Sequence, residues 1–248
     1  MSESILLRQE RCPLCAKEGR DRSGNNLAVY SDGHTYCYGG HGLLDGGSKV
    51  LQFLSSPIPV DKHEVYLPED CDVEYPERCL AWVGQYELTE HDLLSNDVVW
   101  SEQWQRLIFP IYGAEKNLIA WQGRWFGEED RTKWFGLGNL KDTYNVLGNG
   151  KDNILILTED IISAIKVGNS GFLAMPLYGC VVGADRFRRL QKLFPYVTTI
   201  YVWLDPDKRK EAVKEARLGT LYGFRSSTIF SEKDPKEITY EQIKTILL

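Results

Sequence analysis

The second half of the chain alternates between short apolar runs and longer stretches in which apolar residues recur every three or four positions. The short runs are typical of buried strands and the longer stretches of amphipathic helices. Alternation at this spacing predicts a mainly parallel sheet covered by helices, an architecture in which functional groups gather at the carboxyl ends of the strands. Strands are expected at 154–157, 172–175, 199–204 and 227–230, and helices at 161–167, 185–194, 210–217 and 240–248.

Residues 63–150 combine short helical patterns with strands. Two strands are expected at 108–112 and 118–126, on either side of a turn at 113–117. Five of the seven tryptophans lie between positions 100 and 134, which gives this region large apolar side chains of its own. We therefore interpret it as an α+β region that precedes the parallel sheet.

The first 50 residues are rich in glycine, cysteine and turn-forming pairs, and contain few large aliphatic side chains. Short strands are expected at 27–30 and 34–38. A region with so small a core needs a staple to fold. The following segment, 51–62, contains Ser-Pro and Ile-Pro pairs, which disfavour helix, and it is predicted to be an extended linker.

Cysteine spacing indicates what the staple is. Cys12 and Cys15 form a C-x2-C pair, and Cys37 and His41 form a C-x3-H pair after 21 intervening residues. Three thiolates and one imidazole are a regular tetrahedral set for structural Zn²⁺. His34 is the alternative fourth ligand, but we favour His41 because glycines flank it within the second pair. Disulfides are not expected, because we find no secretion signal.

The net charge of −6 is unevenly distributed. Residues 61–100 hold 11 acidic and 2 basic residues, whereas residues 151–248 hold 15 basic and 12 acidic residues. The acidity is therefore confined to one segment, and it does not exclude phosphate contacts elsewhere. No apolar run is long enough to cross a bilayer, so we expect a soluble cytoplasmic protein with no membrane partner.

Acidic residues follow three of the predicted strands. Glu159 comes after the first, Asp205 and Asp207 come after the third, and Asp234 follows the last by a short loop. Any one of them could be a helix cap or a solvated loop residue. Four in this order predict a cluster of carboxylates that needs divalent cations, Mg²⁺ or Mn²⁺, and that can serve nucleotidyl transfer.

At these residues the chain resembles the DnaG-type primases, including the primase half of phage primase–helicases. The family's Toprim motif is a glutamate after one strand and Asp-x-Asp after a later one, matched here by Glu159 and by Asp205-Pro-Asp207. A later Lys-Asp motif is matched by Lys233-Asp234. Residues 31–38 resemble the second zinc knuckle, and Arg106–Ile111 with Gln122-Gly-Arg124 resemble the basic subdomain. Topoisomerases and nucleases share the Toprim motif alone, but the order of all three regions is more specific to primases.

The resemblance implies an organisation and an activity. It implies an N-terminal zinc ribbon at 1–50 that reads the template, a linker at 51–62, and an RNA polymerase domain. That domain would consist of an α+β basic subdomain at 63–150 and a Toprim α/β subdomain with a mainly parallel sheet at 151–248. The implied activity is the synthesis of short RNA primers from ribonucleoside triphosphates on single-stranded DNA, in support of DNA replication.

The resemblance also assigns roles to residues. Glu159, Asp205 and Asp207 would hold Mg²⁺ or Mn²⁺, with Asp234 as a further catalytic acid, and Glu159 could instead handle the proton of the primer hydroxyl. Five other residues are candidates for contacts with nucleotide or template, and they are Arg106, Arg124, Lys133, Lys141 and His34.

The chain departs from the family pattern at three places. His41 must replace a zinc cysteine that the family has near Gly40. Ser163 stands where a second acid is usual, and Asp160 where glycine is usual, which leaves the number of catalytic metal ions open. We find no Gly-x4-Gly-Lys-Ser/Thr phosphate loop, so the replicative helicase and the DNA polymerase are expected to be separate proteins.

Two other classes of function stay open. One is a Toprim enzyme of different reaction type, such as a DNA-nicking nuclease or a topoisomerase fragment. The other is a non-catalytic adaptor that binds single-stranded DNA or a helicase, which Ser163 and Asp160 would favour. The compact size suggests a phage or mobile-element origin, in which case the protein acts in the host cytoplasm.

Overall fold

The computed structural model describes residues 6–19, 26–30, 35–38, 42–45, 65–113, 115–129, 131–150 and 153–247. The chain divides into two compact units, Met1–Lys62 and His63–Leu248. The predicted linker at 51–62 lies outside the described residues. None of the helices in the described ranges is long and apolar enough to cross a membrane.

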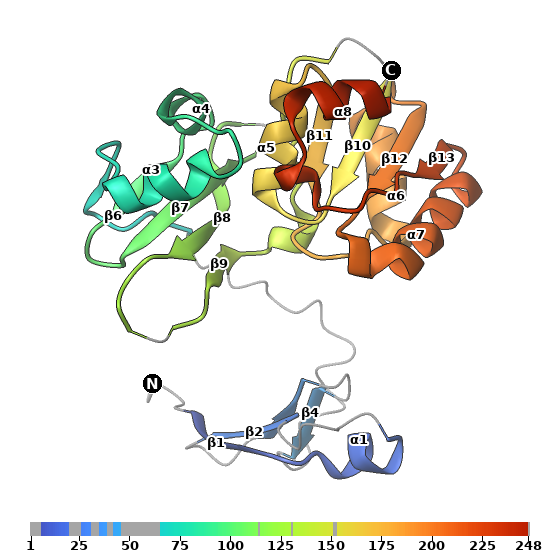
Figure 1. Ribbon diagram of the computed structural model, residues 1–248. Coiled ribbons are helices and arrows are strands. Elements are labelled where there is room, and N and C mark those ends of the chain that lie inside the picture. The colour runs from blue at the N-terminus through green and yellow to red at the C-terminus, as the bar shows by residue number, and fades with distance from the viewer. Residues whose placement is uncertain are drawn as a thin grey trace. The chain divides into compact units, whose positions relative to one another are not determined.

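The first unit contains a four-stranded antiparallel sheet (Figure 1). Its strands follow one another in chain order, and a short helix, α1 (Pro13–Lys17), lies between the first two. Among the residues of this unit whose burial the structure describes, the apolar cluster consists of three cysteines and Leu27. The strands are β1 (Leu6–Glu10), β2 (Leu27–Tyr30), β3 (Thr35–Cys37) and β4 (Gly42–Asp45).

The second unit contains the parallel sheet that the alternating pattern predicts. Its order is β11-β10-β12-β13, and every neighbouring pair is parallel. The expected fold class, a small zinc-ribbon-like β region followed by an α/β region with a parallel sheet, is confirmed. The strands are β10 (Ile154–Thr158), β11 (Leu173–Pro176), β12 (Thr199–Trp203) and β13 (Arg225–Thr228).

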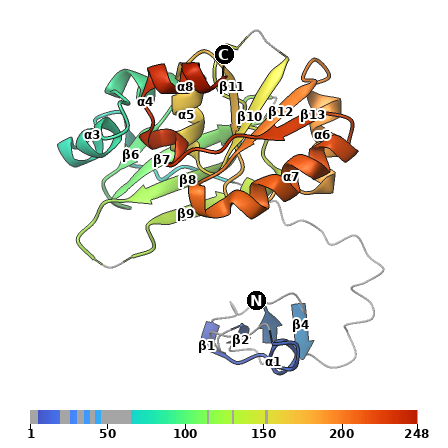
Figure 2. The same ribbon diagram turned by 45° about the vertical axis from the view of Figure 1, so that its right-hand side comes forward.

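Helices cover both faces of this sheet (Figures 1 and 2). Because successive side chains of a strand point to opposite faces, Leu155 and Leu157 pack into one apolar cluster and Ile156 into another. The first cluster includes residues of α6 (Ala184–Leu193) and α7 (Arg209–Leu221). The second includes residues of α5 (Ile161–Asn169) and α8 (Tyr240–Leu247).

Before the parallel sheet comes a five-stranded antiparallel sheet whose strands also follow chain order. Two short helices, α3 (Glu77–Gly84) and α4 (Glu90–Ser95), contribute side chains to its apolar cluster. Thr89 and Asp92 form a capping box that begins α4, since each side chain accepts a hydrogen bond from the other's backbone N–H. The strands are β5 (Cys71–Asp72), β6 (Val99–Ser101), β7 (Arg106–Tyr112), β8 (Leu118–Trp125) and β9 (Trp134–Gly138).

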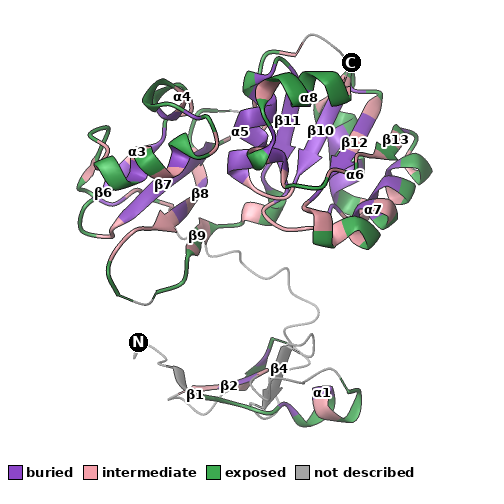
Figure 3. Cartoon of the chain, in the orientation of Figure 1, coloured by how far each residue is buried: buried purple, intermediate pink, exposed green. Residues whose placement is uncertain are grey.

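Helix α5 is shared by both sheets of this unit. Its residues 161–168 are all buried (Figure 3). Ile161, Ile162 and Ile165 pack into the cluster of the five-stranded sheet, whereas Ala164 and Val167 pack against the parallel sheet. Helix α5 is thus enclosed on every side and connects the apolar clusters of the two sheets.

The segment that leads from the five-stranded sheet into β10 runs along β11. Leu147 and Ala174 exchange two backbone hydrogen bonds, of 2.8 and 2.9 Å. The next residue, Gly148, has φ +91°, and a Cβ built on it would lie 2.1 Å from the carbonyl oxygen of Phe172 and 2.8 Å from the Cα of Gly168. A side chain at position 148 therefore has no room.

We expect Gly148→Ala to lower the free energy of unfolding by about 3 kcal/mol or more, because it combines a strained φ with a backbone clash. Gly171→Ala is the matched control, since Gly171 also has a positive φ, +97°, but no atom lies within 4 Å of the position that its methyl group would take. Gly171→Ala should lower the free energy of unfolding by only about 1–2 kcal/mol. Urea denaturation measures both, and equal losses would contradict the assigned contact.

Candidate functional site

The first carboxylates of the predicted acidic cluster lie where β10 ends and α5 begins. Asp160 is the N-cap of α5, and its carboxylate accepts hydrogen bonds from the backbone N–H and the hydroxyl of Ser163, at 2.9 and 3.1 Å. Glu159 precedes it, and Oε2 of Glu159 is buried without a hydrogen-bond partner. The strand end thus presents two adjacent carboxylates, one engaged in capping and one with an unused oxygen.

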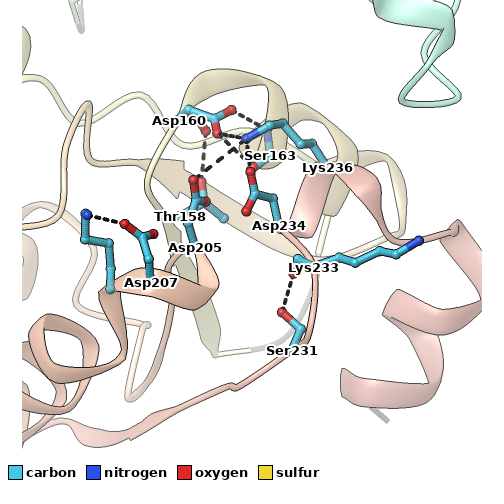
Figure 4. Close-up of polar contacts among 10 residues, drawn as sticks. Thr158, Asp160, Ser163, Asp205, Asp207, Ser231, Lys233, Asp234 and Lys236 are labelled. Atoms are coloured by element: carbon cyan, nitrogen blue, oxygen red, sulfur yellow. Dashed lines mark hydrogen bonds and ion pairs between the residues drawn. The ribbon is translucent and has the colours of Figure 1, made fainter.

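The Asp-x-Asp pair follows β12 and separates into two different environments. Asp205 is the residue before a 3-10 turn at Pro206–Lys208, its side chain is 22% exposed, and its Oδ1 is buried without a partner. The side chain of Asp207 is 71% exposed and forms an ion pair with Lys208. Figure 4 shows Asp207 apart from the other carboxylates. The structure therefore brings Asp205 to the cluster and leaves Asp207 at its margin.

The loop after β13 adds both an acid and a cation. Asp234 precedes a 3-10 turn at Pro235–Glu237, and the ammonium of Lys236 lies among the carboxylates (Figure 4). Nζ of Lys236 lies 2.7 Å from Asp234 Oδ2, 2.9 Å from Asp160 Oδ2 and 3.9 Å from Asp205 Oδ2. Three strand ends thus meet around one lysine.

The proximity of these groups changes their acidity. Burial raises the pKa of Asp205 to about 7; Lys236 counteracts this, and the neighbouring acids Asp234 and Glu159 add to it. Burial also raises the pKa of Glu159. For Lys236, burial alone would lower the pKa, but Asp160 and Asp234 reverse that and raise it. In the cluster, Lys236 is therefore stabilised in its charged form, whereas Asp205 and Glu159 are stabilised in their neutral forms.

A cavity of about 390 Å³ opens beside the cluster, between the parallel sheet and the five-stranded sheet. One side of it carries carboxylates and Lys236, and the other carries aromatic and polar side chains. Five side-chain atoms that lack a hydrogen-bond partner in the described structure belong to its lining, namely Gln122 Oε1, Arg124 Nε, Glu159 Oε2, Tyr178 Oη and Asp205 Oδ1. Buried polar groups without partners are rare in folded proteins, and their concentration here indicates a site for a polar ligand. The lining consists of Trp82, Tyr86, Gln122, Arg124, Trp134, Glu159, Asp160, Ile162, Tyr178, Gly179, Asp205 and Lys236.

Arg124 packs against two neighbouring indoles. Its guanidinium lies 5.3 Å from the ring centroid of Trp82 and 5.8 Å from that of Trp134. The two rings lie 6.0 Å apart in an edge-to-face arrangement. Cation–π contacts with two neighbouring rings restrict the guanidinium and present it to the cavity as a fixed positive charge.

The other predicted basic contacts lie elsewhere. Arg106 is buried and donates hydrogen bonds to the backbone carbonyls of Gly123 and Thr132, at 2.9 and 3.0 Å, so its guanidinium holds the β8–β9 connection together. Lys133 and Lys141 are exposed, and neither lines the cavity. Of the four basic residues expected in this unit, the structure brings only Arg124 to the acidic cluster.

The predicted zinc cysteines come together in the first unit. Cys12 precedes α1, Cys15 lies within it and Cys37 ends β3, and all three are buried. Their sulfur atoms lie within 4.8 Å of one another, and those of Cys15 and Cys37 are 3.4 Å apart. Burial and the neighbouring thiols raise the pKa of Cys15 to about 11, so a bound cation is what would favour the thiolate form. These three residues could hold zinc. His41 and His34, the two candidates for fourth ligand, lie outside the described residues.

Several residues of the site were not singled out from the sequence for a role there. Asp160 and Lys236 stand beside predicted acids, so their place in the chain was a signal that went unused. Trp82, Tyr86, Trp134 and Tyr178 had no such signal, because indoles and phenols in a folded domain are most often core residues.

No protein-family model and no curated protein matches the sequence. Solved structures do match. The primase fragment of the bacteriophage T7 primase–helicase aligns over 98% of this chain and 98% of its own, at 13% identity and a TM-score of 0.53. The zinc-binding and RNA polymerase domains of Aquifex aeolicus primase align over 69% of this chain and 55% of theirs, at 14% identity and a TM-score of 0.56.

The chain has the fold of the DnaG-type primases. A DnaG primase catalytic domain bound to single-stranded DNA also matches, over 71% of this chain and 73% of its own, at 13% identity and a TM-score of 0.53. The resemblance noted from the motifs is thereby confirmed at the level of the fold. At such identities the likeness extends to the architecture, and the chemistry must be argued from the residues of this primase-like chain.

We expect one zinc ion per chain, measured by elemental analysis of purified protein. Cys37→Ser should lose it, because a hydroxyl is a far poorer zinc ligand than a thiolate, and residues 1–50 should unfold with the loss. Cys71→Ser, in β5 of the other unit, is the matched control and should retain the metal. His41→Ala should lose zinc and His34→Ala should keep it; the reverse result would exchange the two assignments.

The raised pKa of Asp205 predicts a pH-dependent stability in metal-free buffer. The folded state disfavours the carboxylate, so this group destabilises the protein increasingly as pH rises from its ordinary pKa of 3.8, and fully above about 7. Asp205→Asn should therefore raise the free energy of unfolding at pH 8 by on the order of 3 kcal/mol, and much less at pH 5.

Asp207→Asn is the matched control for this effect. Lys208 lowers the pKa of Asp207, so its removal takes away a favourable ion pair and should give no gain at pH 8. Thermal unfolding of both variants at the two pH values, with a chelator present, is the measurement. An equal gain for Asp205→Asn at pH 5 and pH 8 would show that ionisation of Asp205 is not the cause.

Proposed function

We propose that the protein is a DNA primase, which synthesises short RNA primers from ribonucleoside triphosphates on single-stranded DNA by metal-dependent nucleotidyl transfer. One observation supports this most. Within a DnaG-type primase fold, carboxylates from two strand ends, a lysine from the loop after a third strand and an arginine packed against two indoles line the same cavity.

Glu159 and Asp205 are the residues proposed to hold Mg²⁺ or Mn²⁺. Each has a buried carboxylate oxygen without a partner, and an ammonium already lies among the neighbouring acids, so the site suits positive charge. Hard carboxylate oxygens are the ligands that these ions prefer. When bound, such an ion would orient the triphosphate and stabilise the negative charge that develops on it. Asp207 would become a further metal ligand only after its ion pair with Lys208 is broken.

Glu159 is also suited to handle a proton. In nucleotidyl transfer the primer 3′-hydroxyl loses its proton as its oxygen bonds to the α-phosphorus and pyrophosphate leaves. A carboxylate whose pKa burial has raised is a better proton acceptor than an ordinary one. The roles of metal ligand and base therefore compete for the same side chain, as the resemblance to the primases implied.

The opposite side of the cavity suits the rest of a nucleotide. The fixed guanidinium of Arg124 can donate charge-assisted hydrogen bonds to phosphate oxygens, and its restraint by Trp82 and Trp134 lowers the entropy lost on binding. Trp82, Tyr86 and Trp134, which are half-buried and line the cavity, would offer stacking surfaces for a base, an interaction that tolerates all four bases.

The remaining partners follow from the same proposal. The Cys12–Cys15–Cys37 unit would hold Zn²⁺ and carry the template-reading surface, with His34 among its contacts. Single-stranded DNA is the proposed template, and it is the molecule bound to one of the matching DnaG primase catalytic domains. The replicative helicase and the DNA polymerase that extends the primers are proposed to be separate chains.

Asp205→Asn tests the proposed chemistry. The variant should fold, retain zinc and bind single-stranded DNA, because those properties depend on other residues. It should lose primer synthesis by at least about 100-fold, on the order of 3 kcal/mol of transition-state stabilisation, because Asn removes a charge that would bind the metal. The assay incubates the protein with ribonucleoside triphosphates, Mg²⁺ and single-stranded DNA and measures labelled oligoribonucleotides.

Glu241→Gln is the control variant, since the Glu241 side chain is 86% exposed and pairs only with Lys244 in the described structure. It should keep full activity. The same assay distinguishes the other classes of function, because a nicking nuclease yields cleaved DNA and an adaptor yields no product. Undiminished primer synthesis by Asp205→Asn would refute the assignment of the site.

A further inference from the structure

The acidic cluster contains a cation supplied by the chain itself. The ammonium of Lys236 makes hydrogen-bond-length contacts with two carboxylates, Asp160 at 2.9 Å and Asp234 at 2.7 Å, and its side chain is only 17% exposed. It lies 3.9 Å from Asp205 Oδ2, within the range of a direct electrostatic attraction. This lysine occupies the kind of position, between carboxylates of several strand ends, in which a divalent ion would sit (Figure 4).

The backbone holds this lysine in place. Pro235 is buried, and the carbonyl oxygen of Lys236 accepts a hydrogen bond of 3.2 Å from Nζ of Lys166. Lys166 is itself buried on α5 and forms a 3.0 Å ion pair with Glu87, which precedes α4. Lys236 is therefore anchored to the shared helix and is unlike a flexible surface lysine that meets an acid by chance.

The lysine divides the four carboxylates into two pairs. Asp160 and Asp234 direct Oδ2 atoms at Lys236, and Asp160 is further engaged with Ser163 as the cap of α5. Glu159 and Asp205 each retain a buried oxygen without a partner. The first pair is already neutralised in part, and the second pair is the one that lacks positive charge.

We propose that Lys236 takes the place of one divalent ion, so that the cluster binds a single divalent cation on the Glu159–Asp205 side while the ammonium serves Asp160 and Asp234. This inference rests on the proposed metal-dependent function and answers how many ions the site takes. A fixed monovalent charge in place of an exchangeable divalent one also lets the four carboxylates coexist in the folded protein before any metal arrives.

Counting bound ions tests the inference without measuring catalysis. The zinc-loaded full chain is titrated with Mn²⁺, and free Mn²⁺ is measured by its electron paramagnetic resonance signal. Wild-type protein should bind one Mn²⁺ per chain and Lys236→Met should bind two, because methionine keeps the length of the side chain but removes its charge. Lys233→Met, in the same loop but with its side chain directed away from the cluster in Figure 4, should bind one.

A second comparison does not depend on the folding of Lys236→Met. With Lys236 present, the Mn²⁺ affinity of Asp160→Asn should stay within about threefold of the wild-type affinity. Asparagine still caps α5, and the carboxylate that it replaces pairs with Lys236 rather than with the metal. Asp205→Asn should weaken Mn²⁺ binding at least tenfold. Equal weakening by these two variants, or one ion bound by both wild type and Lys236→Met at the same affinity, would overturn the inference.

The outcomes also separate this inference from the function on which it rests. Two ions bound by the wild type would overturn the role of Lys236 and leave a metal-dependent primase intact. No Mn²⁺ bound by the wild type or any variant would overturn the metal site itself, and with it both proposals. One ion in the wild type and two in Lys236→Met supports the inference whether or not the product of the enzyme proves to be a primer.

Discussion

Everything at the proposed site depends on the complete burial of one helix. Residues 161–168 of α5 have no exposed face, because the five-stranded sheet and the parallel sheet both pack against it. Glu159 and Asp160 directly precede this helix. Because the burial of apolar side chains fixes α5 between the two sheets, it also fixes these two carboxylates where the apolar clusters of the sheets meet. The price of that position is desolvation, which is the main reason that the pKa of Glu159 is raised.

Much of the second unit could be predicted from the sequence because its signal is periodic. The predicted strand at 154–157 and helix at 161–167 are found at Ile154–Thr158 and Ile161–Asn169, and the parallel arrangement follows from their alternation. Carboxylates after strands could be foreseen for the same reason, since parallel strands end at one edge. The short helices α3 and α4 were not individually predicted, because they follow one another between β5 and β6 without the strand–helix alternation that marks the helices of the parallel sheet.

The basic residues show where such prediction ends. Arg106 and Arg124 lie on paired strands, but Arg124 is opposite Leu107 and Arg106 is opposite Trp125. Residues opposite one another share a face, and successive residues alternate, so the two arginines lie on opposite faces of the sheet. One faces the cavity and the other is enclosed by backbone carbonyls. The pattern of each strand is visible in the sequence, but the register between them is set by the turn and cannot be read from it.

The acids differ for a related reason. Asp205 and Asp207 are equivalent in a motif, yet Asp205 precedes the 3-10 turn and faces the cluster, whereas Asp207 lies within the turn and pairs with Lys208. A motif specifies residue types and spacing, whereas the direction of a side chain in a turn depends on backbone angles that a proline at position 206 helps to fix. Lys236 could be placed only when three strand ends were seen together, since the residues it contacts are up to 76 positions away in the chain.

The junction at Leu147 and Gly148 has a mechanical consequence. It binds the connection between the two sheets to β11 through a pair of backbone hydrogen bonds, and at Gly148 it meets Gly168 of α5 with backbone against backbone. Because these contacts are made by main-chain atoms, which do not change rotamer, the two walls of the cavity are expected to move together. Substrates would then enter and products leave through reorientation of individual side chains along the walls, rather than through a movement of the two sheets apart.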